Sequence, residues 1–338
     1  MIGNRIISVI IPTYNEEKHI AACLDSLLSQ ETSFPIEIII VDNGSKDKTT
    51  KIVEEYVKRF SNKIKLIKLG KNIGPGGARN LGAKNARGEI LVFIDADMVL
   101  DKKYIEKIVM PIMLGETIST THTTEYILNI ENPWVKVQGQ KVKKIYGKEA
   151  GEAFRAIRKD FFLLKNGFDS RYGYHDDRTF FKKTGIKAKL VEDAICYHNN
   201  PDTIYEIFRR NKWIANTLLL IAKEKMGVNI KELLITIMIR TIELLSIPLL
   251  ILAFVFFNNF WIKIIFSLPF IFFIYLSIRQ KILETFTLKE KIILRLIYVP
   301  FYRLIKALGF LIGIISYFFK RIINFLNIFL AIIYCLIL

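Results

Sequence analysis

The sequence predicts an α/β domain with a mostly parallel sheet, followed by helices that lie in or on a lipid bilayer. Short β-branched runs alternate with helical patterns over residues 6–95, and this alternation is typical of βαβ units. Apolar residues make up 51% of the chain, which exceeds the share usual in soluble proteins. Most of the excess follows Lys231, where Ile, Leu and Phe dominate. We therefore expect the part before Lys231 to be surrounded by water and the part after it by a lipid bilayer.

The alternation predicts buried strands and the helices that connect them. The expected strands span 6–11, 36–41, 64–69 and 88–95, and the expected helices span 17–29, 50–60 and 72–86. Polar segments follow the strands directly, at 13–16, 42–45, 72–77 and 95–97. Ligands of parallel sheets bind at the carboxyl ends of the strands, so these segments form the candidate site.

The pattern is less regular after this region. Possible strands at 117–124, 153–158 and 187–196 are expected to complete the sheet. A helix at 203–226 is expected to join the two parts, which gives domains at 1–226 and 227–338. The N-terminal apolar run is too short for a signal peptide, so we expect the first domain to remain in the cytoplasm.

Composition argues against some classes of protein. The formal net charge is +17, but no zinc spacing, RNP-like strand or arginine-rich arm accompanies it, so we expect no nucleic-acid partner. Beside apolar helices, a basic surface more often faces anionic lipid headgroups. Cys23, Cys196 and Cys335 lack metal or redox spacing and are expected to be small apolar fillers.

Two carboxylates lie at the end of the fourth expected strand, in the segment Asp95-Ala96-Asp97. Mg²⁺ binds one or two carboxylates together with substrate phosphate oxygens, and Mn²⁺ accepts the same ligands. Such an ion would neutralise charge on a departing diphosphate. An isolated Asp-x-Asp could instead cap the following helix. The segment is therefore interpreted together with its neighbours.

Four motifs occur in order at the spacing of successive βα units. They are PTYNE at 12–16, VDNGS at 41–45 with Asp47 and Thr49, NIG at 72–74 with GGARN at 76–80, and DAD at 95–97. Together they resemble the nucleotide-binding half of the family 2 glycosyltransferases with the GT-A fold, over roughly residues 6–215. The resemblance implies a nucleoside-diphosphate sugar of the UDP or GDP type as donor, and Mn²⁺ or Mg²⁺ as cofactor.

The resemblance also implies a donor site. Its residues would be Pro12, Thr13, Tyr14, Glu16, Asp42, Asn72, Arg79, Asp95, Ala96 and Asp97. The first motif would border the base and ribose, Asp42 would bind the uracil-like edge, and Arg79 would approach the base or diphosphate. Asp95 would face the ribose and metal, and Asp97 would ligate the metal. Alternatively, Glu16 and Asp47 could be helix N-terminal charges and Arg79 a surface residue.

A second acidic pair follows a Gly-Phe-Asp turn at 167–169. The family commonly has such a turn and then a Glu-Asp pair with the catalytic base, so Asp176 and Asp177 resemble that pair with Asp in place of Glu. Inverting transfer needs a carboxylate to accept the proton of the attacking hydroxyl. Asp177 is the expected base and Asp176 the alternative. The pair could also begin a helix and form local ion pairs with His175 and Arg178.

Two further features are candidates for binding diphosphate, metal or acceptor. The segment FRRNKW at 208–213 resembles the Gln-x-x-Arg-Trp motif of membrane synthases, although Arg replaces Gln and Lys replaces Arg. Arg209 and Lys212 could hold a diphosphate and Trp213 could stack on an acceptor sugar, or all three could mark an interfacial helix. His198 could be a third metal ligand or a structural residue.

The C-terminal part has the lengths of membrane helices. Spans are expected near 233–257 and 260–278, with Arg240 and Glu243 facing each other within the first. Helices at 288–319 and 322–338 could be interfacial or could span the bilayer. The cations between 279 and 306 belong on the cytoplasmic side.

These expectations combine into one hypothesis and two rivals. The hypothesis is a multi-pass cell-membrane enzyme with a cytoplasmic catalytic domain. It would transfer a sugar, with inversion and with a metal ion, to a lipid-linked or membrane-proximal glycan acceptor among membrane lipids. The first rival is a polyprenyl-phosphate (dolichyl-phosphate) sugar synthase. The second is a non-catalytic membrane scaffold that retains the fold.

Overall fold

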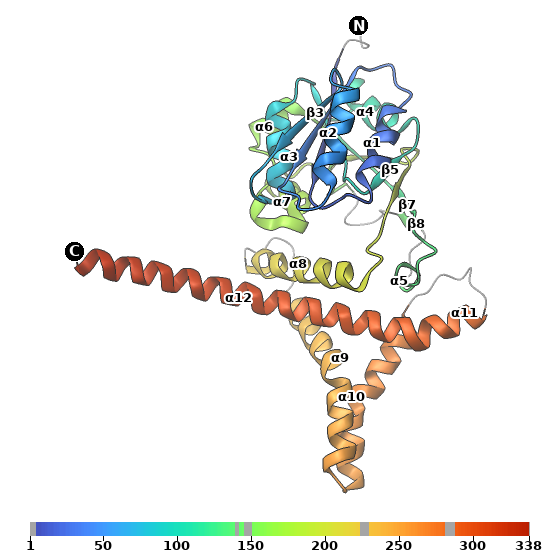
Figure 1. The fold of residues 1–338 in the computed structure, drawn as a ribbon, viewed down its shortest axis with the longest axis vertical. Helices are drawn as coiled ribbons and strands as arrows, with labels where there is room; N and C mark the ends of the chain where they lie inside the picture. The colour runs from blue at the N-terminus through green and yellow to red at the C-terminus, as the bar shows by residue number, and fades with distance from the viewer. Residues whose placement is uncertain (1–4, 139–141, 145–150, 224–229, 281–287, 338) are drawn as a thin grey trace. The chain divides into compact units, whose positions relative to one another are not determined.

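The computed structural model describes residues 5–138, 142–144, 151–223, 230–280 and 288–337, as coloured in Figure 1. The chain divides into two compact units. The first comprises 1–128 and 141–200, and the second comprises 129–140 and 201–338. The sequence-based boundary near residue 226 stays a prediction.

The first unit is built on a seven-stranded sheet with the order β10-β6-β9-β4-β1-β2-β3. Its strands are β1 (Ile7–Thr13), β2 (Ile36–Asp42), β3 (Ile64–Lys68), β4 (Ile90–Phe93), β6 (Ser119–His122), β9 (Ala156–Arg158) and β10 (Lys189–Val191). The first four strands run parallel, and β10 is parallel to β6. Only β9 is antiparallel to its neighbours. The predicted mostly parallel α/β sheet is confirmed.

A second, four-stranded sheet has the order β5-β11-β7-β8. It consists of β5 (Met98–Leu100), β7 (Thr124–Ile127), β8 (Val142–Lys144) and β11 (Cys196–His198). The expected strands at 117–124 and 187–196 are each wrong in one respect, because each divides between the two sheets. Pairing β6 with β10 and β7 with β11 requires both segments to change sheet. Alternation of residue types does not reveal such a change.

Helices cover both faces of the large sheet. On one face are α1 (Ile20–Leu28), α2 (Thr49–Arg59) and α4 (Tyr104–Met113), and on the other are α3 (Gly74–Asn85), α6 (Lys159–Leu164), the 3₁₀ segment η2 (Ser170–His175) and α7 (Asp176–Thr184). Alternate strand residues supply the two cores: Val9 and Ile11 face the first group, while Ile10 faces the second. This alternation follows from the pleat of the strand, and burial on both faces explains why the strands are almost wholly apolar.

The second unit is helical. Its elements are α5 (Pro133–Lys136), α8 (Ile204–Lys223), α9 (Ile230–Phe256), α10 (Phe260–Arg279), α11 (Leu288–Ile293), the π-helical η3 (Leu294–Tyr298) and α12 (Val299–Ile337). Among the described residues, three stretches are long and apolar enough to cross a membrane, namely Ile230–Phe256, Phe260–Arg279 and Lys291–Ile323. The first two match the expected spans closely.

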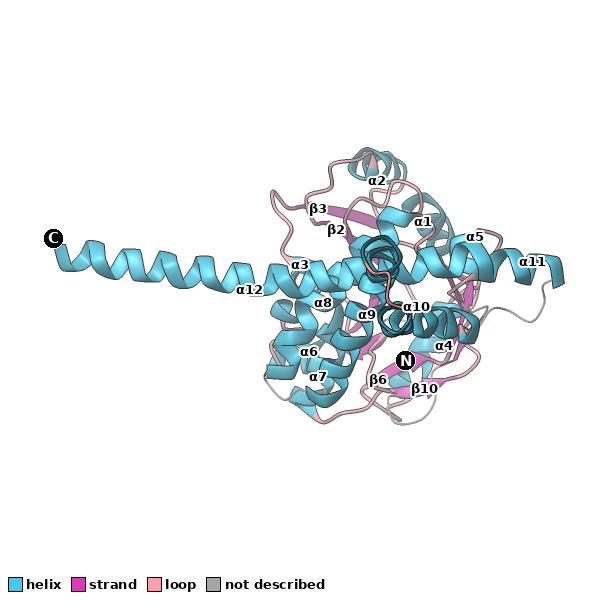
Figure 2. Ribbon diagram, turned by 90° about the horizontal axis from the view of Figure 1, so that it is seen from below, coloured by secondary structure: helices cyan, strands magenta, loops and turns pink. Residues whose placement is uncertain are grey.

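The helices α9 and α10 form a hairpin, and α12 lies across the end where α9 begins and α10 ends (Figure 1). In Figure 2 the hairpin is seen nearly end-on while α12 extends across the view. The expected break near Lys320 and Arg321 is absent, since α12 is continuous to Ile337. No proline or glycine follows Gly313, and single cations are compatible with a helix.

A buried carboxylate connects the helices of this unit. Glu243 is fully buried, and its Oε2 lies 2.6 Å from Nη1 of Arg240, which confirms that these two residues face each other. Arg303 of α12 contacts the other oxygen of Glu243 and donates to Oε1 of Gln280 at 3.2 Å. Removing one member of such a group would leave a buried charge uncompensated.

Two glycines let α8 and α12 approach closely. A Cβ atom at Gly309 would lie 2.6 Å from the carbonyl oxygen of Phe208, and one at Gly313 would lie 2.4 Å from that of Lys212. The second contact lies four residues after the first on both helices, so α8 and α12 run in the same direction. Small residues four apart are a known means of close helix packing in membranes.

We expect Gly313→Leu to destabilise the second unit, because the new side chain would displace the α8 backbone. Overpacking of this kind costs about 1–3 kcal/mol, which should lower the thermal midpoint of the detergent-purified protein. The matched control is Gly70→Leu, since no atom lies within 4 Å of a Cβ at Gly70. Equal midpoints for the two variants would contradict the close packing.

Candidate active site

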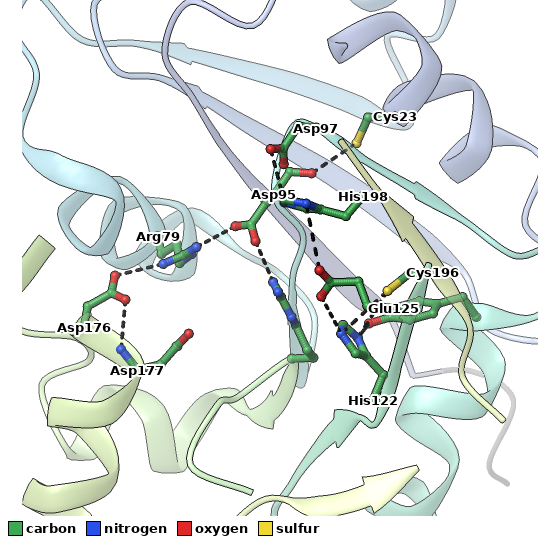
Figure 3. A network of polar contacts seen from close by, with 12 residues as sticks. Cys23, Arg79, Asp95, Asp97, His122, Glu125, Asp176, Asp177, Cys196 and His198 are labelled. Atoms are coloured by element: carbon green, nitrogen blue, oxygen red, sulfur yellow. Dashed lines mark hydrogen bonds and ion pairs between the residues drawn. The ribbon is translucent and has the colours of Figure 1, made fainter. Parts of the chain in front are cut away.

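A chain of buried and half-buried charges lies at the carboxyl edge of the large sheet (Figure 3). Asp95 follows β4, and its two oxygens accept from Nη2 of Arg79 at 2.6 Å and Nη1 of Arg155 at 2.9 Å. Burial opposes the charged form of Asp95, but Arg155 and Arg79 outweigh it and hold the pKa of this carboxyl well below its usual range. Asp95 is therefore a fixed negative charge.

Arg79 extends the chain to the second acidic pair. Its Nη1 donates to Oδ2 of Asp176 at 2.8 Å, and its side chain is only 10% exposed. The approach depends on Gly76, because a Cβ there would lie 2.9 Å from Asp176 Oδ2. Arg79 is thus not the surface residue considered as an alternative. It links α3 to α7 from within the fold, and its predicted contact with the nucleotide stays a prediction.

The Gly-Phe-Asp turn is held against α3 by Asn80. The Asn80 amide donates to the Phe168 carbonyl oxygen at 2.7 Å and accepts from the Phe168 N–H at 2.9 Å. Gly167 has a φ of +56°, and a Cβ there would lie 2.2 Å from Asn80 Oδ1. Glycine is required on both counts. The turn therefore sets the position of the chain that leads to Asp176.

The two carboxylates of the acidic pair differ in their surroundings. Asp176 is buried and engaged by Arg79, whereas the carboxylate of the half-buried Asp177 accepts no hydrogen bond from the described side chains. Burial raises the pKa of Asp177 to about 7, and repulsion from Asp176 adds to the rise. Both residues begin α7; the side chains of His175 and Arg178 lie outside the described residues, so their ion pairs are not assessed.

Asp97 and His198 face each other because β5 pairs with β11, with Met98 opposite His198. Asp97 Oδ2 lies 3.2 Å from His198 Nε2, and both side chains are partly accessible. Burial opposes a positive charge on His198, but Asp97, followed by Glu125, outweighs it, so the pKa of His198 is raised. The position favours positive charge. Its carboxylate is a ligand that suits Mn²⁺, and the imidazole is a second donor for a transition-metal ion.

Asparagine and aspartate side chains order the loops beside this edge. Asp42 is buried, and its oxygens accept from the hydroxyls of Ser45 at 2.5 Å and Thr50 at 2.8 Å. Asn72 Oδ1 accepts from the Asn43 amide at 3.0 Å and from the Gly74 N–H at 2.8 Å. Asp42 and Asn72 therefore position the β2–α2 loop and the start of α3, whatever they bind.

The first motif forms the turn after β1. Asn15 has a φ of +58°, and its N–H donates to the Ser45 hydroxyl at 3.0 Å. The Glu16 N–H donates to the Thr49 hydroxyl at 2.7 Å. Pro12 is half-buried, Thr13 is buried and Tyr14 is exposed. The first two motifs are thus hydrogen-bonded to each other, as expected for neighbouring strand ends.

Three predicted residues belong to α8, an element of the second unit. Arg209 and Trp213 are exposed one turn apart, and the Arg209 guanidinium lies 5.9 Å from the centre of the Tyr205 ring. Lys212 is half-buried. This face combines aromatic and cationic groups, which suits both binding of a diphosphate and acceptor sugar and a helix at the membrane interface. Its role stays a prediction.

The sequence reasoning missed three residues of the site. Arg155 pairs with Asp95, and Glu125 and His122 lie behind His198. None of them belongs to a motif. Arg155 reaches the site because its carbonyl accepts from Phe93 of β4 at 2.8 Å and its N–H donates to Thr120 of β6 at 3.0 Å. No local pattern in the sequence could have suggested it.

The order of these elements and motifs matches a known family. The model of glycosyl transferase family 2 matches residues 8–182. The chain belongs to this family. The matched segment includes Asp95, Asp97 and the acidic pair, while His198 lies beyond it.

Two relatives are similar to the chain over a limited segment. Human dolichyl-phosphate beta-glucosyltransferase is 38% identical over 110 residues, which cover 30% of this chain and 34% of that protein. Staphylococcus aureus poly(ribitol-phosphate) beta-N-acetylglucosaminyltransferase TarS is 39% identical over 102 residues, covering 29% and 17%. The chain thus matches about a third or less of the length of these relatives.

A solved structure supports the fold over most of the chain. It is the mannosyltransferase PcManGT from Pyrobaculum calidifontis, with a TM-score of 0.51 and 16% identity over 93% of this chain and 87% of that one. At this identity the likeness concerns the fold alone. The predicted GT-A type of fold, followed by apolar helices, is confirmed.

We expect Asn80→Ala to loosen the Gly-Phe-Asp turn, because both hydrogen bonds to Phe168 are lost. The loss of buried partners costs about 1–3 kcal/mol and should lower the thermal midpoint. Asn85→Ala, on the same helix, is the control, since its side chain is exposed. A variant of Asn80 as stable as this control would contradict the clamping role.

Proposed function

We propose that this family 2 glycosyltransferase moves a sugar from a nucleoside-diphosphate sugar to a lipid-linked or membrane-proximal glycan, with inversion and with a divalent metal ion. One observation carries the proposal. Asp97 with His198 forms a cation-favouring position, and Asp177 lies on the same charge network with a raised pKa. A metal position and a proton acceptor at one sheet edge are the two elements that metal-dependent inverting transfer to a hydroxyl acceptor uses.

Asp177 is the proton acceptor in this proposal. The acceptor hydroxyl oxygen forms a bond to the anomeric carbon while the bond from that carbon to the diphosphate oxygen breaks. The diphosphate leaves with the electron pair, and the hydroxyl proton passes to the Asp177 carboxylate. Asp176 is less suited to this role because its Oδ2 is paired with Arg79. A base with a pKa near the working pH is the most effective.

Asp97 and His198 would hold the metal ion, and Asp95 would support the site as a fixed charge. When bound, the ion would neutralise negative charge on the leaving diphosphate. The structure of PcManGT contains GDP-Man and Mn²⁺, which supports Mn²⁺ as the ion and a nucleotide-sugar as the donor. UDP- and GDP-sugars are both included in the proposal.

The second unit supports a position at the membrane. A hairpin of α9 and α10 that crosses the bilayer would leave α12 near one membrane surface, since α12 lies across the hairpin. Its charged residues favour that surface. We therefore propose a multi-pass protein of the cell membrane with the catalytic unit in the cytoplasm and α8 and α12 at the interface.

A polyprenyl phosphate is the second candidate acceptor. One observation in the second unit favours it: Arg240 and Arg303 flank Glu243, and Lys306 lies near both arginines. Cations thus outnumber carboxylates among the described side chains of this cluster, which suits a lipid phosphate. The name of the human relative, a dolichyl-phosphate beta-glucosyltransferase, is consistent with such an acceptor.

We expect Asp97→Asn to reduce metal-dependent sugar transfer by roughly a hundredfold or more, because the proposed metal loses its carboxylate ligand. The measurement is release of UDP or GDP from a panel of nucleotide-sugars with Mn²⁺ or Mg²⁺. Asp101→Asn, beyond β5, serves as the control and should retain activity. Undiminished transfer by Asp97→Asn with the metal still required would disprove the metal assignment.

The acceptor type determines the pH dependence. With a hydroxyl acceptor, the rate should rise as the pH passes upward through about 7, because Asp177 accepts a proton only when ionised. Asp177→Asn should then lose about a hundred- to ten-thousandfold in rate together with this rise, while Asp160→Asn on the surface should lose neither. A phosphate acceptor is already ionised and needs no base, so near-wild-type turnover of Asp177→Asn would instead support a polyprenyl phosphate.

A further inference from the structure

We propose that Glu125 is a positioning residue that orients the His198 imidazole for metal binding, and that His122 and Tyr104 hold Glu125 in place. The inference rests on the proposed function, because it takes His198 as a metal ligand. In Figure 3, His198, Glu125 and His122 follow one another in a row that leads away from Asp97.

The row starts from the pairing of two strands in the small sheet. Glu125 of β7 lies opposite Cys196 of β11, two residues before His198. The His198 ring therefore lies between two carboxylates: Nε2 is 3.2 Å from Asp97 Oδ2, and Nδ1 is 3.9 Å from Glu125 Oε1. Asp97 is partly accessible and Glu125 is buried. One carboxylate thus faces the proposed site and the other lies behind it.

His122 and Tyr104 fix the far side of Glu125. His122 Nε2 lies 3.4 Å from Glu125 Oε2, and the Tyr104 hydroxyl lies 2.8 Å from His122 Nδ1. All three residues are buried, with exposures of at most 4%. If the tyrosine hydroxyl donates to Nδ1, the Nε2–H of His122 points at Glu125. A buried carboxylate needs such donors, so the arrangement limits the movement of Glu125.

Glu125 can fix the orientation of the His198 ring. Among the described residues, His198 Nδ1 is buried and has no hydrogen-bond partner. Its distance to Glu125 is about 1 Å longer than the usual N–H···O distance of about 2.9 Å, so a small rotation closes the bond. Nδ1–H then donates to Glu125, and the lone pair of Nε2 faces a cation beside Asp97. Metal-binding histidines usually donate their other N–H to a carboxylate or carbonyl in this way.

A separate metal site is the competing interpretation of the same cluster. Ligand atoms of His122, Glu125 and Cys196 all lie within 4.8 Å of one another. However, Cys196 Sγ is 3.6 Å from both ring nitrogens of His122, so it is aligned with neither lone pair. Tyr104 and Glu125 already face those nitrogens. The geometry therefore favours a hydrogen-bonded row over a second ion.

The test measures Mn²⁺ affinity directly, by electron paramagnetic resonance of free Mn²⁺ in titrations of the detergent-purified full chain with UDP or GDP present. Glu125→Gln should weaken Mn²⁺ binding by about 10- to 100-fold, while kcat at saturating Mn²⁺ changes little. Glu192→Gln, at an exposed position before β11, is the matched control. Tyr104→Phe removes only a hydroxyl and should weaken binding less; it serves as the probe if Glu125→Gln does not fold.

A double-mutant cycle separates positioning from general destabilisation. If Glu125 acts through His198, then Glu125→Gln combined with His198→Ala should bind Mn²⁺ no more weakly than His198→Ala alone. A further loss of affinity in the double variant would overturn the inference. Full affinity of both Glu125→Gln and Tyr104→Phe, while His198→Ala binds weakly, would also overturn it. Either result would leave the proposed function intact. Unchanged affinity of His198→Ala would instead remove the metal role of His198 itself.

Metal content of the purified chain decides the competing interpretation. Elemental analysis should find no tightly bound ion that Cys196→Ser removes. An ion that disappears in Cys196→Ser, and persists in Asp97→Asn, would show that the cluster is a metal site of its own and would overturn the positioning role.

Discussion

The ion pairs of Asp95 are the interaction on which the catalytic unit depends. This carboxylate lies among buried groups, and a buried charge is costly unless it is paired and hydrogen-bonded. Arg79 and Arg155 supply the pairing from two different elements, α3 and the segment before β9. The end of β4, the helix α3 and the segment before β9 are therefore held together by charge as well as by apolar packing.

The same network passes its constraint to the acidic pair. Arg79 is shared between Asp95 and Asp176, so the position of α7 depends on the end of β4. Because Asp176 is paired with Arg79, the proposed mechanism assigns proton transfer to the neighbouring Asp177. These two adjacent aspartates thus have different surroundings, and differences of this kind commonly divide the tasks of paired carboxylates. Within the second unit, Glu243 between Arg240 and Arg303 joins helices in a similar manner.

Much of this site could be located from the sequence, and for a clear reason. The motifs at 12–16, 41–45, 72–80 and 95–97 each follow a strand, and parallel strands bring their carboxyl ends to one edge. The prediction that Asp42 and Asn72 bind the nucleotide rests on the resemblance, whereas in the structure their side chains order the loops. Arg155 and Glu125 escaped notice because single residues outside motifs give no local signal. The change of sheet within 117–124 was missed because this segment consists almost wholly of Thr, Ser and His, without an apolar period that would mark where one strand ends.

The sequence by itself determined the first four strands, their order along the chain, the family and the apolar helices, since periodicity, turn residues and composition are local properties. Tertiary structure alone decided which charges meet. Arg155 reaches Asp95 because β9 pairs with β4, and His198 reaches Asp97 because β11 pairs with β5. It also decided that α12 lies across the α9–α10 hairpin. Partners of this kind are chosen by strand order and helix packing between distant segments, and such choices leave no mark on the residues nearby in the sequence.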